Sequence, residues 1–100
     1  MLSLKTPVEV ANELAQRVRH RRLRRGWTQA EIAQRAGVKQ ATYVVFERYG
    51  RISLLRLLKV LDVLELLEEI DRVGRNEDLK NLTLNDLVEP ARKRGRRNSA

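Results

Sequence analysis

Arginine and lysine side chains supply most of the chemistry that this 100-residue sequence offers. Residues 14–51 hold ten of them against two acids, Glu31 and Glu47. Residues 60–89 reverse the balance with three basic and nine acidic residues, and the segment from Pro90 onward adds five basic residues and no acid. Two basic regions flanking an acidic one indicate a polyanion partner such as a nucleic acid. Alternatively, the many basic residues reflect genome composition, since sixteen of the 21 are arginine.

The sequence lacks the arrangements of side chains that catalysis and metal binding need. The sequence has no cysteine, and its single histidine, His20, lies among arginines whose charge would repel a metal cation. It has no glycine-rich phosphate loop and no Ser/Asp arrangement beside His20. We therefore expect no enzyme, no metal site and no cofactor. Residues 1–13 lack a secretory pattern and no apolar run could span a bilayer, so we expect no membrane partner and a cytoplasmic, nucleoid-associated protein.

The first predicted helix spans residues 8–25. Its apolar residues recur at the spacing of one helical face: Ala11, Leu14, Ala15 and Val18. Gly26 then provides a stop signal. The helix also carries arginines that we expect to provide solubility and long-range attraction rather than specific bonds: Arg17, Arg19, Arg21, Arg24 and Arg25.

Two shorter helices follow, separated by a glycine. The segment Thr28–Glu31 is a capping box for a helix that runs to about residue 36. Gly37 supplies the left-handed conformation that ends it. The next helix, at about residues 40–48, would bury Tyr43 and Phe46. Two short helices joined by a tight glycine turn make a helix-turn-helix.

Residues 29–48 resemble the helix-turn-helix of the Cro, phage-repressor and Xre family. Gly37 lies at the turn, Ala33 is small where the helices touch, and the apolar positions of the pattern are filled: Ile32, Ala36, Val38, Tyr43 and Phe46. The likeness covers about residues 14–70. It implies an all-α, compact five-helix domain of the lambda-repressor-like type at residues 8–72, with a C-terminal extension at residues 73–100 that ends in a partly disordered basic tail. The alternative is a helical hairpin that does not bind DNA.

The resemblance places the start of the helix at residues 40–48 in the major groove of double-stranded DNA. Gln40 would bond bidentately to adenine, and the apolar Val44 and Val45 would touch thymine methyl groups. Ala41 shares this side of the helix, opposite Tyr43. The two valines could instead pack against the fourth helix or against a partner.

The resemblance also implies contacts to DNA phosphates. The family uses a glutamine at the position of Gln29 on the DNA backbone. Lys39 lies at the turn, where it is a poor N-cap. Three further candidates lie toward the same side and could equally be solvated surface residues: Thr42, Arg48 and Arg51. Arg22 and Glu47 match a pair of the phage-repressor branch and are expected to be structural.

The fourth predicted helix, capped by Ser53, is more apolar than one core face requires. Eight of the eleven residues 54–64 are Leu or Val. A fifth helix at about residues 66–72 would cover part of this surface and a second subunit the rest, because the family commonly dimerises here; a monomeric core is the alternative. The family often has glycine at the position of Glu65, so the fourth and fifth helices could run together in this chain.

The C-terminal region contains two further features. Thr83 predicts a cap for one helical turn through Val88, which Pro90 stops. Residues 92–97 are too charged to fold alone and would neutralise phosphates nonspecifically. Arg94–Arg96 also resembles a minor-groove arm of the AT-hook type.

Three functions fit these features. The first is a dimeric, sequence-specific transcriptional regulator, a repressor. Residues 41–64 also look like the HipB-like branch, whose members are antitoxins that repress their own operon and bind a kinase toxin, a protein partner. The third is an RNA or ribosome-associated bridging factor that uses the same fold.

Overall fold

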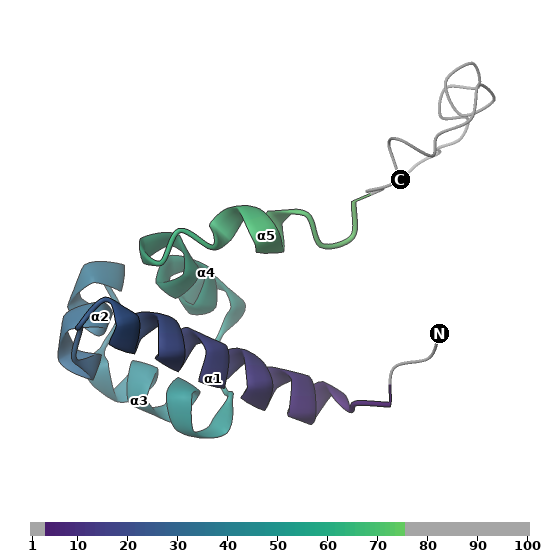
Figure 1. Cartoon of the computed structure of the whole chain (residues 1–100), viewed down its shortest axis with the longest axis horizontal. Coiled ribbons are helices and arrows are strands. Elements are labelled where there is room, and N and C mark those ends of the chain that lie inside the picture. Colours follow the sequence, from purple (N-terminus) through teal and green to yellow (C-terminus); the bar gives the residue numbers. More distant parts are fainter. Residues whose placement is uncertain (1–3, 76–100) are drawn as a thin grey trace, which may run out of the picture.

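Five α-helices form the part of the chain that the structure, a computed structural model, describes, residues 4–75 (Figure 1). They are α1 (Pro7–Arg24), α2 (Gln29–Ala36), α3 (Gln40–Tyr49), α4 (Leu54–Val63) and α5 (Leu67–Asp71). The predicted all-α, five-helix class is therefore confirmed. The cap at Thr83, the basic segment 92–97 and most of the predicted extension at residues 73–100 lie outside the described residues.

The helices surround one core. α1 packs along α3, α2 contacts both α3 and α4, and α5 folds back onto α4. The largest fully buried side chains come from α1 to α4 and the residue after α4: Tyr43, Phe46, Ile32, Leu64, Val18 and Val60. The predicted burial of Tyr43 and Phe46 is confirmed, and their rings meet edge to face with centroids 6.1 Å apart. Between residues 4 and 75, no helix is both long and apolar enough to traverse a bilayer.

Capping boxes fix where the first two helices begin. Before α2, the Thr28 hydroxyl accepts from the Glu31 amide at 3.0 Å, and the Glu31 carboxylate accepts from the Thr28 amide at 2.7 Å, as predicted. The same arrangement joins Thr6 and Glu9 before α1. α1 therefore begins at Pro7, one residue earlier than predicted, because proline is favourable at the first helical position.

Glycines end α2 and α3. Gly37 has φ 73° and ends α2 as predicted. Gly50 ends α3 with the same φ of 73°, and it also lies against α1. A Cβ atom at Gly50 would come within 3.0 Å of the Ala11 carbonyl carbon, whereas one at Gly37 would meet nothing within 4 Å. The close approach at Gly50 therefore sets the distance between α3 and α1.

The predicted fifth helix is confirmed as a separate element, and the possibility that it runs together with the fourth helix is not realised. Glu65 takes the left-handed conformation, with φ 62°, that a glycine would normally occupy. The Leu66 amide donates to the Leu61 carbonyl at 2.8 Å, and the Glu65 amide donates to Asp62 at 3.0 Å. These two bonds form a Schellman motif, which ends α4 although no glycine is present. Leu66, half-buried against the core, helps to hold the turn.

Glu65→Gly is therefore expected to raise the free energy of unfolding by about 1 kcal/mol, because glycine adopts a positive φ without the Cβ clash that glutamate meets. Urea denaturation would measure the change. Glu69→Gly is the matched control: Glu69 is an exposed residue inside α5, so glycine there should destabilise. Destabilisation by both substitutions would contradict the left-handed assignment of Glu65.

Candidate nucleic-acid interface

α3 divides into a buried side and an exposed side. Tyr43, Phe46 and Glu47 are buried. On the other side, Ala41 is exposed and Val45 keeps 43% of its surface accessible. α4 therefore does not cover Val45 within the described chain. This exposed side of α3, which we call the reading face, comprises Gln40, Ala41, Val44 and Val45.

The reading face grades from polar to apolar along α3. Gln40 is the first residue of α3 and is exposed, so both groups of its amide are accessible. Val44 is half-buried and lies at the edge of the face. Tyr49, four residues after Val45, is 52% exposed, with the Arg48 guanidinium 5.6 Å from its ring centroid. Sequence reasoning missed Tyr49, although its spacing of four residues from Val45 places it next to the end of this face.

The other predicted contact residues flank α3. Lys39 is the exposed N-cap residue of α3 and its side chain makes no capping hydrogen bond, so its interpretation as a poor N-cap is confirmed. Thr42 is half-buried, and Arg51 is exposed just after Gly50. Within residues 4–75 the basic side chains at both ends of α3 are thus accessible to an anion.

A buried ion pair holds α3 against α1. Arg22 Nε donates to Glu47 Oε2 at 2.8 Å and a second Arg22 nitrogen donates to Oε1 at 3.1 Å, a bidentate pair. The side chains are only 7% and 5% exposed. Arg22 also donates to the Trp27 carbonyl at 2.8 Å, and the Tyr43 hydroxyl donates to Glu47. The predicted structural pairing of Arg22 with Glu47 is confirmed.

Gln29 belongs to the same network. It is the first residue of α2 and is half-buried, and its Nε2 donates to Glu47 Oε1 at 3.0 Å. The residue that we predicted on DNA phosphate therefore also ties the start of α2 to α3. Its side-chain oxygen is not used in this bond.

The network shifts the pKa values of its members. Burial by itself would raise the pKa of the Glu47 carboxyl, but hydrogen bonds from Arg22, Tyr43 and Gln29 outweigh it and leave the pKa below its ordinary value. The hydrogen bond to Glu47 raises the pKa of Arg22 against the effect of burial. Burial, followed by the bond to Glu47, raises the pKa of Tyr43. Glu47 is thus a carboxylate and Arg22 a cation at neutral pH.

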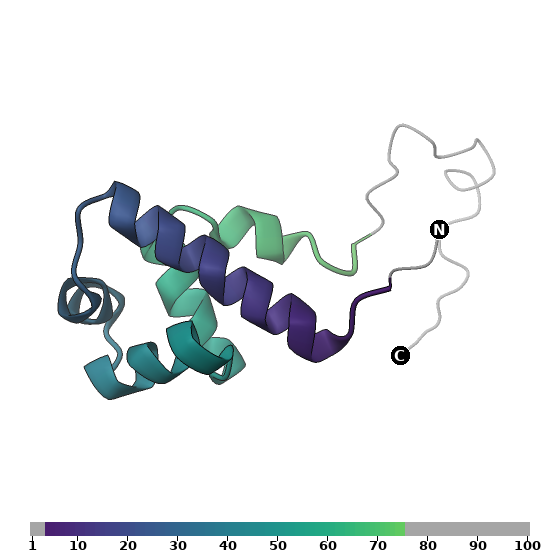
Figure 2. The same ribbon diagram turned by 60° about the horizontal axis from the view of Figure 1, so that its bottom comes forward.

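Three helices meet beside the reading face. α3 packs against both α1 and α2 (Figure 2), and residues of all three helices line a hollow beside it. We call it the α1–α3 hollow; it is lined by Gln16, Arg19, Gln29, Val44, Glu47 and Arg48. The structure thus joins Gln29, Val44 and Arg48, which we predicted as DNA contacts, to Arg19, which we did not. Arg19 precedes Arg22 by three residues, so its helical position was the available signal.

Comparison with known protein families agrees with this arrangement. A family model described as a helix-turn-helix matches residues 18–69, just over half of the chain. The match contains α2, α3 and α4 whole, together with the last part of α1 that carries Arg19 and Arg22. No curated protein matches the chain.

Proposed function

The chain belongs to the Cro/C1-type helix-turn-helix family of DNA-binding regulators, and we propose that it is a transcriptional repressor that binds double-stranded DNA as a homodimer. We assign DNA binding to residues 8–72 and treat residues 73–100 as an extension. The proposal depends above all on the reading face, where α3 exposes Gln40, Ala41 and Val45 although its opposite side is fully packed. A helix exposed in this way fits the width of the major groove.

The side chains of the reading face favour A·T base pairs. A glutamine amide carries one donor and one acceptor group, which match adenine N7 and N6 in the major groove. Val44 and Val45 would contact thymine methyl groups, and Ala41 leaves room for the bases to approach. The phosphate contacts in this proposal come from the residues around the face: Gln29, Lys39, Thr42, Arg48 and Arg51. These contacts position α3 without reading sequence.

Gln40→Ala is expected to reduce discrimination between a selected binding site and a scrambled duplex by about 1–3 kcal/mol, because it removes one bidentate base contact. The site would first be obtained by selection from random duplexes, and affinities would be measured by fluorescence anisotropy at fixed salt. Gln34→Ala is the control, since Gln34 is an exposed glutamine on α2 and does not belong to the reading face. Equal discrimination by the Gln40 variant and wild type would refute the role of Gln40.

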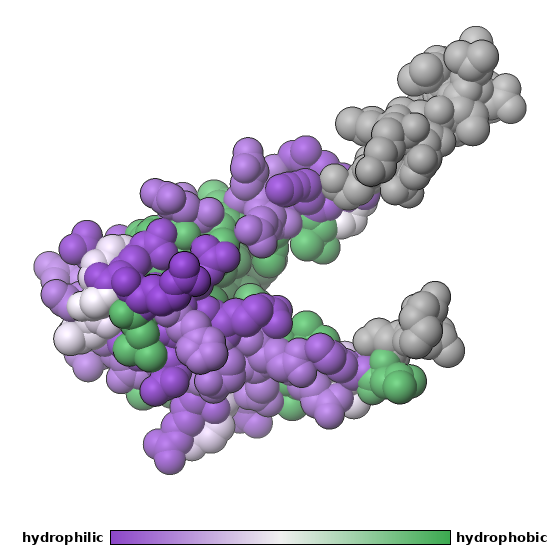
Figure 3. Space-filling view, viewed as in Figure 1, coloured by the Kyte–Doolittle hydropathy of each residue, from purple (hydrophilic) through white to green (hydrophobic). Residues whose placement is uncertain are grey.

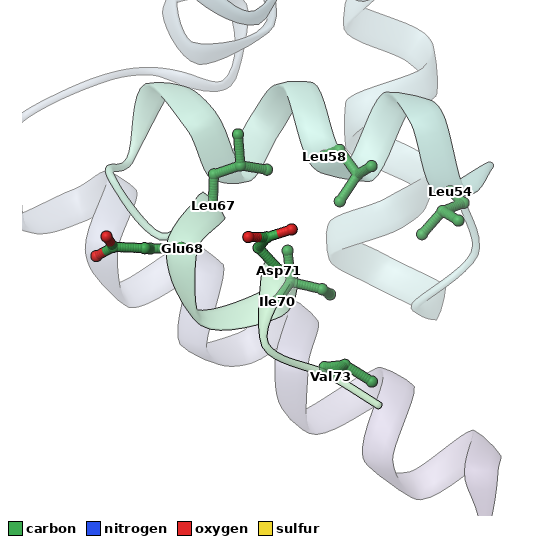
Figure 4. Close-up of a pocket in the computed structure, with 7 residues that line it drawn as sticks. All are labelled: Leu54, Leu58, Leu67, Glu68, Ile70, Asp71 and Val73. Carbon is green, nitrogen blue, oxygen red and sulfur yellow. The ribbon is translucent and has the colours of Figure 1, made fainter. Parts of the chain in front are cut away.

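The surface of α4 and α5 supports self-association. α4 buries Val60 and Leu61, but Leu54 and Leu55 remain 66% and 64% exposed. A groove of about 870 Å³ runs between the two helices (Figure 4) and is lined by Leu54, Leu58, Leu67, Glu68, Ile70, Asp71 and Val73. Apolar surface is also visible where α4 and α5 face α1 (Figure 3). We call the groove between α4 and α5, whose lining Figure 4 shows, the α4–α5 groove.

A second copy of the chain is the occupant that we propose for the α4–α5 groove. The leucines exceed what the domain's own core uses, and an apolar groove of this kind is normally covered in a stable protein. A twofold dimer would present two copies of α3 about 34 Å apart, one turn of DNA. Each subunit would then bind half of a palindrome.

The antitoxin alternative gives the last thirty residues, 71–100, as a possible binding segment for a toxin partner. Residues 41–64 look like the HipB-like branch, and the exposed leucines at the start of α4 belong to that segment. In this alternative the protein represses its own operon and a kinase toxin binds to it. A toxin gene next to its own gene, and co-purification of the two products, would favour this alternative over a simple repressor.

A further inference from the structure

The α1–α3 hollow contains an arginine, Arg19, that forms no hydrogen bond with the buried network of the described residues. Four donor groups already bind the Glu47 carboxylate: two from Arg22 and one each from Gln29 and Tyr43. A carboxylate has about four acceptor positions, so these donors saturate it. Arg19 Nε forms a long ion pair with Glu47 Oε1 at 4.0 Å, beyond hydrogen-bonding distance, and the Arg19 side chain is 47% exposed. Among residues 4–75, Arg19 makes no hydrogen bond to another side chain.

The charges around the hollow do not cancel. Among the described residues, Glu47 is the one acid that lines the hollow, and Arg22 behind it already neutralises that carboxylate. Arg19 and Arg48 therefore leave an excess of positive charge on either side of the hollow, with the amides of Gln16 and Gln29 beside them. Planar guanidinium groups bind phosphate oxygens in a bidentate manner. The hollow thus has the chemistry of a phosphate site.

The position of the hollow beside the reading face indicates that its phosphate belongs to the DNA backbone. Val44 belongs both to the hollow and to the reading face, so the two surfaces are continuous. With α3 in a major groove, a hollow that adjoins the reading face would face the phosphates of a strand that borders the groove. We propose that Arg19 and Arg48 together bind one backbone phosphate of the DNA, with Arg19 reaching from α1. This inference rests on the proposed function and gives α1 a direct contact to DNA.

Not every arginine of α1 lines the α1–α3 hollow. Arg17 and Arg21 line a separate hollow between α1 and α5, together with the acidic Glu69 and apolar residues. They carry the same charge as Arg19 but lie on another side of the helix. Arg17 is therefore a control that matches Arg19 in residue type, helix and net charge.

The test compares Arg19→Gln with Arg17→Gln in the full chain. Binding to one random-sequence duplex of about two turns would be measured across a series of salt concentrations, because phosphate contacts do not depend on sequence. Arg19→Gln is expected to reduce the slope of log affinity against log salt by about 0.9, the value for one phosphate contact, whereas Arg17→Gln keeps the wild-type slope. Arg19→Lys should keep the slope, because it keeps the charge, but bind more weakly than wild type.

Each result has a separate meaning. Equal slopes for the wild type, Arg19→Gln and Arg17→Gln would overturn the inference while leaving DNA binding intact. A lower melting temperature of Arg19→Gln with an unchanged slope would also overturn it, and would make Arg19 a structural partner of Glu47. Failure of the wild type to bind any duplex would overturn the proposed function and this inference together.

Discussion

Glu47→Gln is expected to lower the free energy of unfolding by roughly 3–5 kcal/mol, because it leaves the buried cation of Arg22 without its counter-charge. The Tyr43 hydroxyl would still find an oxygen, but the glutamine amide cannot accept the four donors that the carboxylate accepts. Urea denaturation would measure the loss. Glu69→Gln, at an exposed position, is the control and should stay within about 0.5 kcal/mol of wild type.

The same substitution should change how stability depends on pH. The pKa of Glu47 is lower in the folded protein than its ordinary value of about 4.3, so the folded state binds this proton less tightly than the unfolded state. Glu47 therefore adds stability above pH of about 4.3, and this contribution is lost as the pH falls through the lower folded pKa. The Glu47→Gln protein lacks it. Parallel profiles of stability for the two proteins below neutral pH would show that Glu47 does not contribute in this way.

The elements that the sequence predicted well are specified by nearby residues. The Thr28 capping box acts over three residues, and Gly37 ends α2 through its own backbone. Tyr43 and Phe46 recur at helical spacing, so their burial follows from the period of α3. The pairing of Arg22 with Glu47 is different, because the two residues are 25 positions apart and only the family resemblance indicated it.

The remaining features depend on tertiary contacts. Gln29 bonds to Glu47, and Arg19 lies in the α1–α3 hollow, because α1, α2 and α3 meet there. The spacing of residues within a single helix cannot predict contacts among three helices. Glu65 adds another case: its residue type argues against a left-handed turn, but the Leu66 amide bond to Leu61 and the packing of Leu66 favour one. Local preference was overridden by the packing of α5 on the core.

The double variant Leu54→Gln/Leu67→Gln is expected to weaken self-association by about a thousandfold. Leu54 and Leu67 line the α4–α5 groove and are 66% and 37% exposed in the single chain. In a twofold interface each substitution occurs twice, so four leucines are lost. At about 1 kcal/mol for each partly buried leucine, the loss is roughly 4 kcal/mol, which corresponds to about a factor of 10³ in the dissociation constant. Sedimentation equilibrium would measure that constant.

The affinity for a palindromic DNA site should also decrease when the dimer is weakened. In a dimer the second half-site is bound at a high effective concentration, so its loss costs about 10²–10⁴ in affinity for a palindrome but little for a single half-site. Leu4→Gln/Leu23→Gln is the matched control, because both leucines are exposed, at 88% and 47%, and neither lines the α4–α5 groove. Glutamine is a good helix former, so α4 and α5 should persist in the double variant. A wild-type protein that sediments as a monomer, or two double variants that bind the palindrome equally well, would refute the proposal that a second copy covers the groove.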